Sequence, residues 1–320
     1  MAGIGKLGSL EMLSVWAMRL VECTFAIRGD PSMTARADLT PYGNHVPNWF
    51  IRAILAITRR LPPTWVGLRT SMPLRRVAIN SLRGRPVDTV IWNARVRLYP
   101  DRNGCEKNAL FTPQMFDVQE LRALAAAMDR RIASGATFTF IDIGANVGLY
   151  SLYVASRSGA RARILALEPQ PGIVERLRFN VKINPSANIA ILPVAVTDHD
   201  GQVDLVINER DRGGTRLAKA GTIDHDAEAV PVMCRALAAI LDEAGIFSID
   251  ALKIDIEGAE DLALAPFLRT APPGLLPGLV LIEDRPGDWS VDLYALMQER
   301  GYTVISRNRQ NVLLRLQLSA

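Results

Sequence analysis

The sequence predicts an α/β protein with a doubly wound, mostly parallel sheet that ends in an antiparallel hairpin and is preceded by an extension of helices and a hairpin. From about residue 137 onward, short β-branched runs alternate with stretches of helical periodicity, which is typical of right-handed βαβ crossovers. Acidic residues stand at the ends of several expected strands, beside glycine or proline turns. Ligands bind at those strand ends in open parallel sheets.

The C-terminal part contains regularly spaced elements. Thr137–Ile143 is a strand that leads into a glycine turn, and Pro171–Ile183 is a helix with proline in its first turn, a favourable start. Asp198-His-Asp-Gly201 supplies turn chemistry, so Val203–Ile207 should form a hairpin with the preceding strand. We expect strands at 137–143, 161–167, 189–196, 203–207, 249–256, 279–283, 302–306 and 312–316, and helices at 147–158, 171–183, 236–244, 259–268 and 291–300.

The N-terminal part has a less regular pattern. Helices are expected at 10–27 and 47–60, one or two strands at 87–98, and a helix at 117–131 that begins at an Asp117 cap. Prolines at 62, 63, 73 and 86 interrupt the middle of this part. We therefore divide the chain into an accessory region, residues 1–134, and a second domain, residues 135–320.

Composition restricts the class of protein. Apolar residues make up 49% of the 320 residues and charged residues 22%, which is ordinary for a soluble globular protein. The three cysteines are far apart, which argues against a disulfide framework or a zinc site. Residues 10–27 are interrupted by Glu11, Arg19 and Glu22, so neither a signal peptide nor a membrane span fits. We expect a cytoplasmic protein.

Charge is unevenly distributed along the chain. Residues 1–135 contain 19 Lys and Arg against 10 Asp and Glu, and eight arginines but no acid lie between Asp38 and Asp88. This region either faces an anionic partner or is a solvated basic surface. The helix at 47–60 places Phe50, Ile51, Ile54 and Ile57 on one face and Arg52, Arg59 and Arg60 opposite. It could pack on the protein or lie on an anionic membrane; no nucleic-acid motif is present.

Three loops carry the candidate site. The first, Asp142-Ile-Gly144-Ala-Asn146-Val-Gly148, lets the backbone turn sharply and approach a ligand, and its acid can accept hydrogen bonds from an ammonium group. Asn146 stands where a dinucleotide fingerprint needs its second glycine. The second loop begins at Glu168, whose carboxylate suits a ribose diol in either a nicotinamide or another nucleoside cofactor. A tight structural turn and a solvent-facing acid are the plain alternatives.

The third loop is Lys253-Ile-Asp255-Ile-Glu257-Gly258. Alternation along a strand places Lys253, Asp255 and Glu257 on one side, and burying three charges in an apolar strand is costly unless they are paired or functional. A purely structural ion pair is the alternative to a catalytic role.

Together these motifs resemble the FkbM family of methyltransferases. The resemblance rests on DIGANVGLYSL, EPQP with the helix ending Asn180…Asn184, LKIDIEGAE and LVLIED, over roughly residues 137–306. It implies a class I methyltransferase (Rossmann-like) fold with one antiparallel strand near the C-terminus, and S-adenosylmethionine bound by Asp142, Gly144, Asn146, Gly148 and Glu168. It also implies O-methylation of a hydroxyl, often on sugars or polyketides. Residues 1–135 lie mostly outside the shared motifs.

Methyl transfer to a hydroxyl benefits from a base or a divalent cation. Asp255 and Glu257 are the best candidates for either role, and Glu283 could complete a set of oxygen ligands for magnesium. His199 and His225 are weaker candidates for a base, and the loop Gly213–Arg216 either closes over substrate or is a hairpin end. The expected partner is a small-molecule, sugar or glycolipid substrate. A nicotinamide-dependent oxidoreductase and a non-catalytic binding protein are the competing functions.

Overall fold

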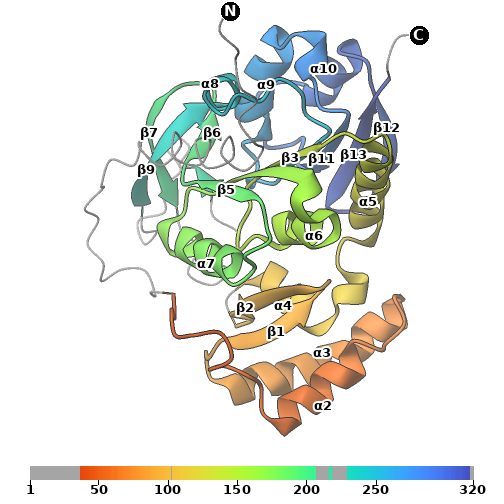
Figure 1. Ribbon diagram of the computed structural model, residues 1–320, viewed down its shortest axis with the longest axis vertical. Helices are drawn as coiled ribbons and strands as arrows, with labels where there is room; N and C mark the ends of the chain where they lie inside the picture. Colours follow the sequence, from red (N-terminus) through yellow and green to blue (C-terminus); the bar gives the residue numbers. More distant parts are fainter. Residues whose placement is uncertain (1–36, 102, 207–215, 218–228, 318–320) are drawn as a thin grey trace, which may run out of the picture.

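A computed structural model describes residues 37–101, 103–206, 216–217 and 229–317. A seven-stranded sheet lies at its centre (Figure 1), made of β3 (Phe138–Ile143), β4 (Ala162–Leu167), β5 (Ile189–Leu192), β10 (Ala251–Ile254), β11 (Leu279–Glu283), β12 (Tyr302–Arg307) and β13 (Asn311–Leu316). Their order is β12-β13-β11-β10-β3-β4-β5. The pairs from β11 to β5 are parallel, and β13 is antiparallel to both neighbours. This topology confirms the expected class I methyltransferase fold with its C-terminal antiparallel hairpin.

Helices cover both faces of this sheet (Figure 1). One face carries α5 (Val118–Ala133), α6 (Leu149–Ser158) and α7 (Pro171–Lys182), and the other α8 (Leu237–Glu243), α9 (Glu260–Thr270) and α10 (Leu293–Glu299). Successive strand residues point to opposite faces. Accordingly, β3 contributes Phe138 and Phe140 to the first core and Ile141 and Ile143 to the second. The helices expected after residue 135 are present, with ends shifted by no more than two residues.

A second, smaller sheet corrects the prediction for residues 189–207. Its strands are β6 (Ala195–Thr197), β7 (Gly201–Val206), β8 (Arg216–Leu217) and β9 (Ala229–Ala236), in the order β6-β9-β7-β8. The strand expected at 189–196 is two strands, because Pro193 has no N–H to continue a ladder. The hairpin partner of β7 is β9, not β6. Strand β9 was not predicted from the sequence.

The N-terminal part forms a layer of its own beside α6 and α7 (Figure 1). It contains α2 (Trp49–Thr58), α3 (Trp65–Leu82), the antiparallel pair β1 (Val87–Ile91) and β2 (Ala94–Leu98), and α4 (Gly104–Phe111), followed by the 3₁₀ turn η1 (Pro113–Met115). Two further 3₁₀ turns are η2 (Gly159–Arg161) and η3 (Pro273–Leu275). The helix expected at 10–27 lies outside the described residues.

Two of these helices, α3 and α4, were not predicted. Their starts are capped by the side chains of Thr64 and Asn103, which accept hydrogen bonds from backbone N–H groups. Pro73 lies inside α3 with its ring on the exposed side, while the opposite face is buried. Tertiary packing therefore overrides the helix-breaking tendency of Pro73, whereas Pro62, Pro63 and Pro86 lie between elements.

The apolar face of α2 packs inward. Ile51 and Ile54 are buried in the core that also contains Phe140 and Leu281, and Arg59 bonds to the Leu110 carbonyl instead of facing solvent with Arg52 and Arg60. Packing on the protein is therefore correct for Ile51 and Ile54, whereas Ile57, expected on the same face, is 51% exposed. Contact of this helix with a membrane stays a prediction. None of the helices in the described part of the chain is long and apolar enough to cross a bilayer.

Asn180 in α7 and Asn184 just after its end bond the N-terminal hairpin to the main domain. The side-chain oxygens of Asn180 and Asn184 accept hydrogen bonds from the backbone N–H groups of Arg97 and Arg95, at 2.8 Å and 2.9 Å. The Asn180 amide also donates to the Val147 carbonyl in the glycine loop, at 3.0 Å. One buried cluster accordingly contains residues from both regions, and the division at residue 134 stays a prediction.

Candidate active site

A cavity of about 590 Å³ opens at the carboxyl ends of β3, β4 and β10. Its walls come from the loops that follow these strands, from the start of α3, from α4 with η1, and from the turn between β12 and β13. The position agrees with the rule that ligands bind beyond the carboxyl ends of parallel strands. Part of the wall comes from the N-terminal region, which the sequence left without a role in the site.

The glycine loop contributes Gly144 and Asn146 to the cavity wall, whereas Gly148 does not line it. Gly144 has φ +73°, and a Cβ there would lie 2.0 Å from the Asp255 carbonyl oxygen, so only glycine fits between the two loops. Gly148 has φ +87° and packs beside Leu177. Asn146 also has a left-handed φ of 51°, which asparagine tolerates better than most residues.

Glu168 lies in the cavity wall and holds the glycine loop. Its carboxylate oxygens accept hydrogen bonds from the backbone N–H groups of Asn146, at 2.9 Å, and Gln170, at 3.0 Å. Burial raises the pKa of Glu168 to about 7, although both N–H groups act in the opposite direction. A buried carboxylate of this kind has spare lone pairs for further hydroxyl donors.

Asp142 lies behind the cavity and is not part of its wall. It is fully buried, and one carboxylate oxygen accepts hydrogen bonds from the Ser151 hydroxyl, at 2.6 Å, and backbone N–H, at 3.1 Å. The other oxygen lies 3.9 Å from the Lys253 ammonium nitrogen. Burial raises the pKa of Asp142, against the effect of Lys253. Direct contact of Asp142 with the methionine end of a cofactor thus stays a prediction. In this structure Asp142 lies beside Lys253, which in turn bonds to the Gly144 carbonyl in the cavity wall.

Lys253 connects the first and third loops. Its ammonium donates to the Gly144 carbonyl at 3.2 Å and lies 3.3 Å from an Asp255 carboxylate oxygen. Burial alone lowers the pKa of this lysine, but Asp255 and Asp142 raise it above its usual value. Lys253 is therefore a buried cation that fixes the backbone of the glycine loop and the orientation of Asp255.

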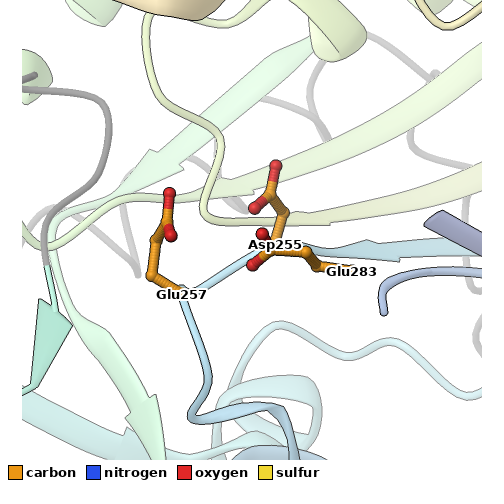
Figure 2. Close-up of side chains that lie close together, drawn as sticks. All are labelled: Asp255, Glu257 and Glu283. Carbon is orange, nitrogen blue, oxygen red and sulfur yellow. The ribbon is translucent and has the colours of Figure 1, made fainter. Parts of the chain in front are cut away.

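Three carboxylates converge beside this lysine, as Figure 2 shows. Asp255, Glu257 and Glu283 each place an oxygen within 4.8 Å of the other two. The sequence suggested that Asp255 and Glu257 lie on one face of a strand. Strand β10 ends at Ile254, however, so both residues lie in the loop that follows it. The turn at Glu257, with φ +58°, brings them together. Of the three, Asp255 and Glu257 line the cavity.

Arg285 balances part of this negative charge. Its guanidinium pairs with Glu257 and with Glu283, the latter at 2.6 Å. Burial raises the pKa of Glu283 to about 7, and the Asp255 carboxylate acts in the same direction. Glu257 is thus held by an arginine, whereas Asp255 is held by Lys253 and is the more exposed of the two side chains.

Asp117, which was expected to cap a helix, is a residue of the cavity wall. It precedes α5 as expected, but its side chain caps no backbone group, and its φ is +39°. Instead its carboxylate accepts a hydrogen bond from the Tyr150 hydroxyl at 2.8 Å and lines the cavity. Burial raises its pKa to about 6. A capping aspartate and a site aspartate look alike in sequence, so only the fold separates them.

Cys105 also lines the cavity from α4, and burial raises the pKa of its thiol. The other candidates lie elsewhere. His199 is exposed, pairs with Asp198 at 2.7 Å, and is not in the cavity wall. His225 and residues 213–215 lie outside the described part of the chain.

Comparison with known proteins shows which family has the motifs that form this cavity. The family described as the methyltransferase FkbM domain matches residues 142–304. The chain is 31% identical over 153 residues to the AMB antimetabolite synthetase AmbE of Pseudomonas aeruginosa (strain PAO1), a match that covers 38% of this chain but only 7% of AmbE. It is 29% identical over 196 residues to the methyltransferase sdnD of Sordaria araneosa, covering 53% of this chain and 74% of sdnD.

Solved structures show more distant similarity. Monomeric WbdD is 14% identical, with a TM-score of 0.37, and the match covers 62% of this chain and 41% of WbdD. A precorrin-6y C5,15-methyltransferase from Geobacter metallireducens GS-15 is 14% identical, with a TM-score of 0.34, over 57% of this chain and 81% of that one. Neither similarity indicates an acceptor. The family match covers half of the chain, includes Asp142, Gly144, Glu168, Asp255 and Glu257, and favours methyl transfer over the nicotinamide-dependent alternative. This chain belongs to the FkbM family of methyltransferases.

Proposed function

We propose that this chain transfers the methyl group of S-adenosylmethionine to a hydroxyl oxygen of a sugar, glycan, glycolipid or polyketide-type acceptor. The observation that carries the proposal is the make-up of one cavity. Gly144, Asn146 and Glu168, which suit a nucleoside cofactor, share its wall with Asp117 and Asp255, which suit a hydroxyl donor.

The residues of the cofactor loops fit S-adenosylmethionine. The backbone at Gly144 leaves no room for a Cβ, and the buried Glu168 carboxylate suits the two hydroxyl donors of a ribose. When bound, S-adenosylmethionine supplies a methyl group attached to a sulfonium sulfur. After transfer, this sulfur is part of a neutral thioether, the leaving group. The protein's main contribution is then to hold the acceptor oxygen in line and exclude water.

Acceptor-side chemistry is assigned to the carboxylates. As the new oxygen–methyl bond forms, the hydroxyl proton passes to a carboxylate and from there to solvent. Asp255 is the leading candidate, because Lys253 orients it and its other side is open to the cavity. Asp117 is the second, because it lines the same cavity and its pKa of about 6 leaves it ionised at neutral pH. Glu257 is already paired with Arg285 and suits orientation of the acceptor.

A magnesium-assisted version of the same reaction is the alternative. Asp255, Glu257 and Glu283 offer oxygen ligands at the spacing of a cation site (Figure 2). The guanidinium of Arg285 already occupies one side of this cluster, which favours the metal-free version. Treatment with chelator decides between them: loss of turnover that magnesium restores would establish the metal version.

Titration calorimetry with S-adenosylhomocysteine and with NADH tests the cofactor. We expect binding of the first only, and a loss of about 1–3 kcal/mol in Glu168→Ala, the range for losing hydrogen bonds to a charged group. A radiolabelled methyl donor with a panel of sugars, glycolipids and polyketide alcohols then tests the acceptor. NADH binding without an S-adenosylhomocysteine signal would overturn the proposal, and cofactor binding with no transfer to any acceptor would favour a non-catalytic protein.

A further inference from the structure

Helices α2 and α3 form the outermost layer at one end of the protein (Figure 1). Each buries one side against the rest of the protein, through Ile51 and Ile54 in α2 and Ala78 and Leu82 in α3. The opposite sides are exposed and together are called the outer α2–α3 face. Its large apolar residues are Trp49, Ile57, Trp65, Val66, Met72 and Val77, and its arginines are Arg52, Arg60, Arg69 and Arg76.

This face is positively charged without counter-charges from its own segment. Residues 39–87 contain eight arginines and no aspartate or glutamate. Arg59 and Arg75 point inward, where they bond to the Leu110 carbonyl and the Asn108 side chain. The arginines of the outer α2–α3 face remain exposed. Such a surface attracts an anionic one over a range set by the ionic strength.

The apolar residues of the same face make a lipid surface the best match. Trp49 and Trp65 are 79% and 70% exposed. Exposure of so large an apolar ring to water is unfavourable, and tryptophan is enriched at membrane–water interfaces. Arginines alternate with these residues, and Arg69 lies over the Trp65 ring at 4.9 Å. Tryptophan, methionine and arginine are also enriched at protein–protein interfaces, so a second copy of the chain is the competing occupant. Mixed aromatic and basic residues suit a headgroup layer.

The face is continuous with the active-site cavity. Thr64, Trp65 and Leu68, at the start of α3, belong both to this end of the protein and to the cavity wall. We propose that the outer α2–α3 face docks on an anionic phospholipid surface and brings the cavity mouth to the headgroups. The acceptor is then a hydroxylated amphiphile presented from that surface; this second statement rests on the proposed function.

Vesicle flotation of the full chain, without methyl donor, tests the docking. Wild type should float with vesicles containing about one third phosphatidylglycerol at about 0.05 M salt, and be released at about 0.5 M salt, where screening is strong. It should not float with pure phosphatidylcholine. The double variant Arg60→Gln, Arg76→Gln should bind about 30-fold more weakly. The variant Val66→Ser, Met72→Ser should weaken binding without changing its salt dependence.

A matched control removes two exposed arginines elsewhere. Arg269→Gln, Arg315→Gln changes the net charge equally but leaves the outer α2–α3 face intact, so its vesicle binding should equal wild type. Equal loss in both double variants would overturn the proposal, because overall charge would then explain the binding. So would wild type that stays unbound at low salt. Light scattering that shows a dimer abolished by Val66→Ser, Met72→Ser would assign the face to a second copy of the chain instead.

The result is separable from the proposed function. S-adenosylhomocysteine binding is measured on the same preparations, and the surface variants Arg60→Gln, Arg76→Gln should keep it. If vesicles fail to bind while the cofactor binds, the docking surface is rejected and the methyltransferase proposal stands. If vesicles bind and the cofactor does not, the docking surface stands and the methyltransferase proposal is rejected.

Discussion

The side-chain amide of Asn103 donates a hydrogen bond to the side-chain oxygen of Asn146, with 3.0 Å between the two atoms. Asn103 begins α4 in the N-terminal region, and Asn146 belongs to the glycine loop of the methyltransferase fold. The N-terminal region thus bonds directly to the glycine loop, in addition to lining the cavity. A change in this region is therefore expected to alter cofactor binding.

Asn103→Asp tests that connection. The new carboxylate keeps the acceptor that caps α4 but places a negative oxygen against the Asn146 oxygen. We expect the affinity for S-adenosylhomocysteine to fall about 3- to 10-fold, equivalent to about one hydrogen bond. Thermal stability should fall as well, because Asn103 is buried and an unpaired buried carboxylate is costly. Asn48→Asp, the same substitution at the cap of α2, is the control. Equal affinities in both variants would show that the Asn103–Asn146 bond does not support the loop.

If Glu168 binds the ribose as proposed, the affinity for the cofactor should depend on pH. Its pKa of about 7 in the empty site must fall when ribose hydroxyls donate to the ionised carboxylate. Binding should therefore release protons near pH 6–7, and affinity should rise by about an order of magnitude between pH 5.5 and 7.5. Calorimetry in buffers of different ionisation enthalpy measures the release. Glu168→Gln should abolish it, and an unchanged proton release in that variant would contradict the assignment.

The same group affects stability in the opposite direction. Its folded pKa lies above the unfolded value of 4.5, so the folded state binds the extra proton between about pH 4.5 and 7. The contribution of Glu168 to the free energy of unfolding thus falls as pH rises through that window. Thermal unfolding of Glu168→Gln without cofactor should lose this part of the pH dependence. A wild-type and a variant curve that run parallel would contradict it.

Gly144→Ala should be the most damaging small substitution in the site. The added Cβ would lie 2.0 Å from the Asp255 carbonyl oxygen, at a residue with φ +73°, so the two loops must separate. We expect loss of detectable cofactor binding and a loss of stability of at least about 1–3 kcal/mol. Gly135→Ala is the control, because Gly135 has φ +80° but open space around a Cβ. Comparable damage in both would assign the effect to the backbone angle alone.

Asp255→Asn should separate binding from turnover. The substitution keeps the shape of the side chain and removes the charge beside Lys253. We expect cofactor affinity to be retained within about threefold and turnover to fall about 10²-fold or more, the usual effect of losing a general base. Asp129→Asn, which breaks an exposed pair with Arg157, should leave turnover unchanged. Full activity in Asp255→Asn would exclude Asp255 as base and as metal ligand.

Asp117 should appear in the pH–rate profile. Its pKa of about 6 predicts that turnover rises through about pH 6 if this carboxylate receives the proton. Asp117→Asn keeps an acceptor for the Tyr150 hydroxyl and should remove that limb. A limb that persists in Asp117→Asn and vanishes in Asp255→Asn would assign the base to Asp255.

The sequence by itself determined the central sheet and its loops. The short apolar runs that became β3, β4 and β11, and the turn residues Gly144 and Gly148, are short-range signals. Glu168 was correctly placed at the end of β4 for the same reason, since an acid directly after a strand lies at the sheet edge. These features depend on residues close together in the chain, so a single sequence is enough to predict them.

Only the tertiary structure decided which charges meet. The strand pattern grouped Asp255 and Glu257 on one face, whereas a left-handed turn at Glu257 brings them together with Glu283. Asp117 was expected to cap a helix and is instead a cavity carboxylate, and the 3.9 Å approach of Lys253 to the buried Asp142 is visible only in the fold. Side-chain roles of this kind depend on contacts between residues of different elements, 33 positions apart for Asp117 with Tyr150 and 109 for Lys253 with Gly144. Local periodicity carries no information about such contacts, because packing between distant elements fixes them.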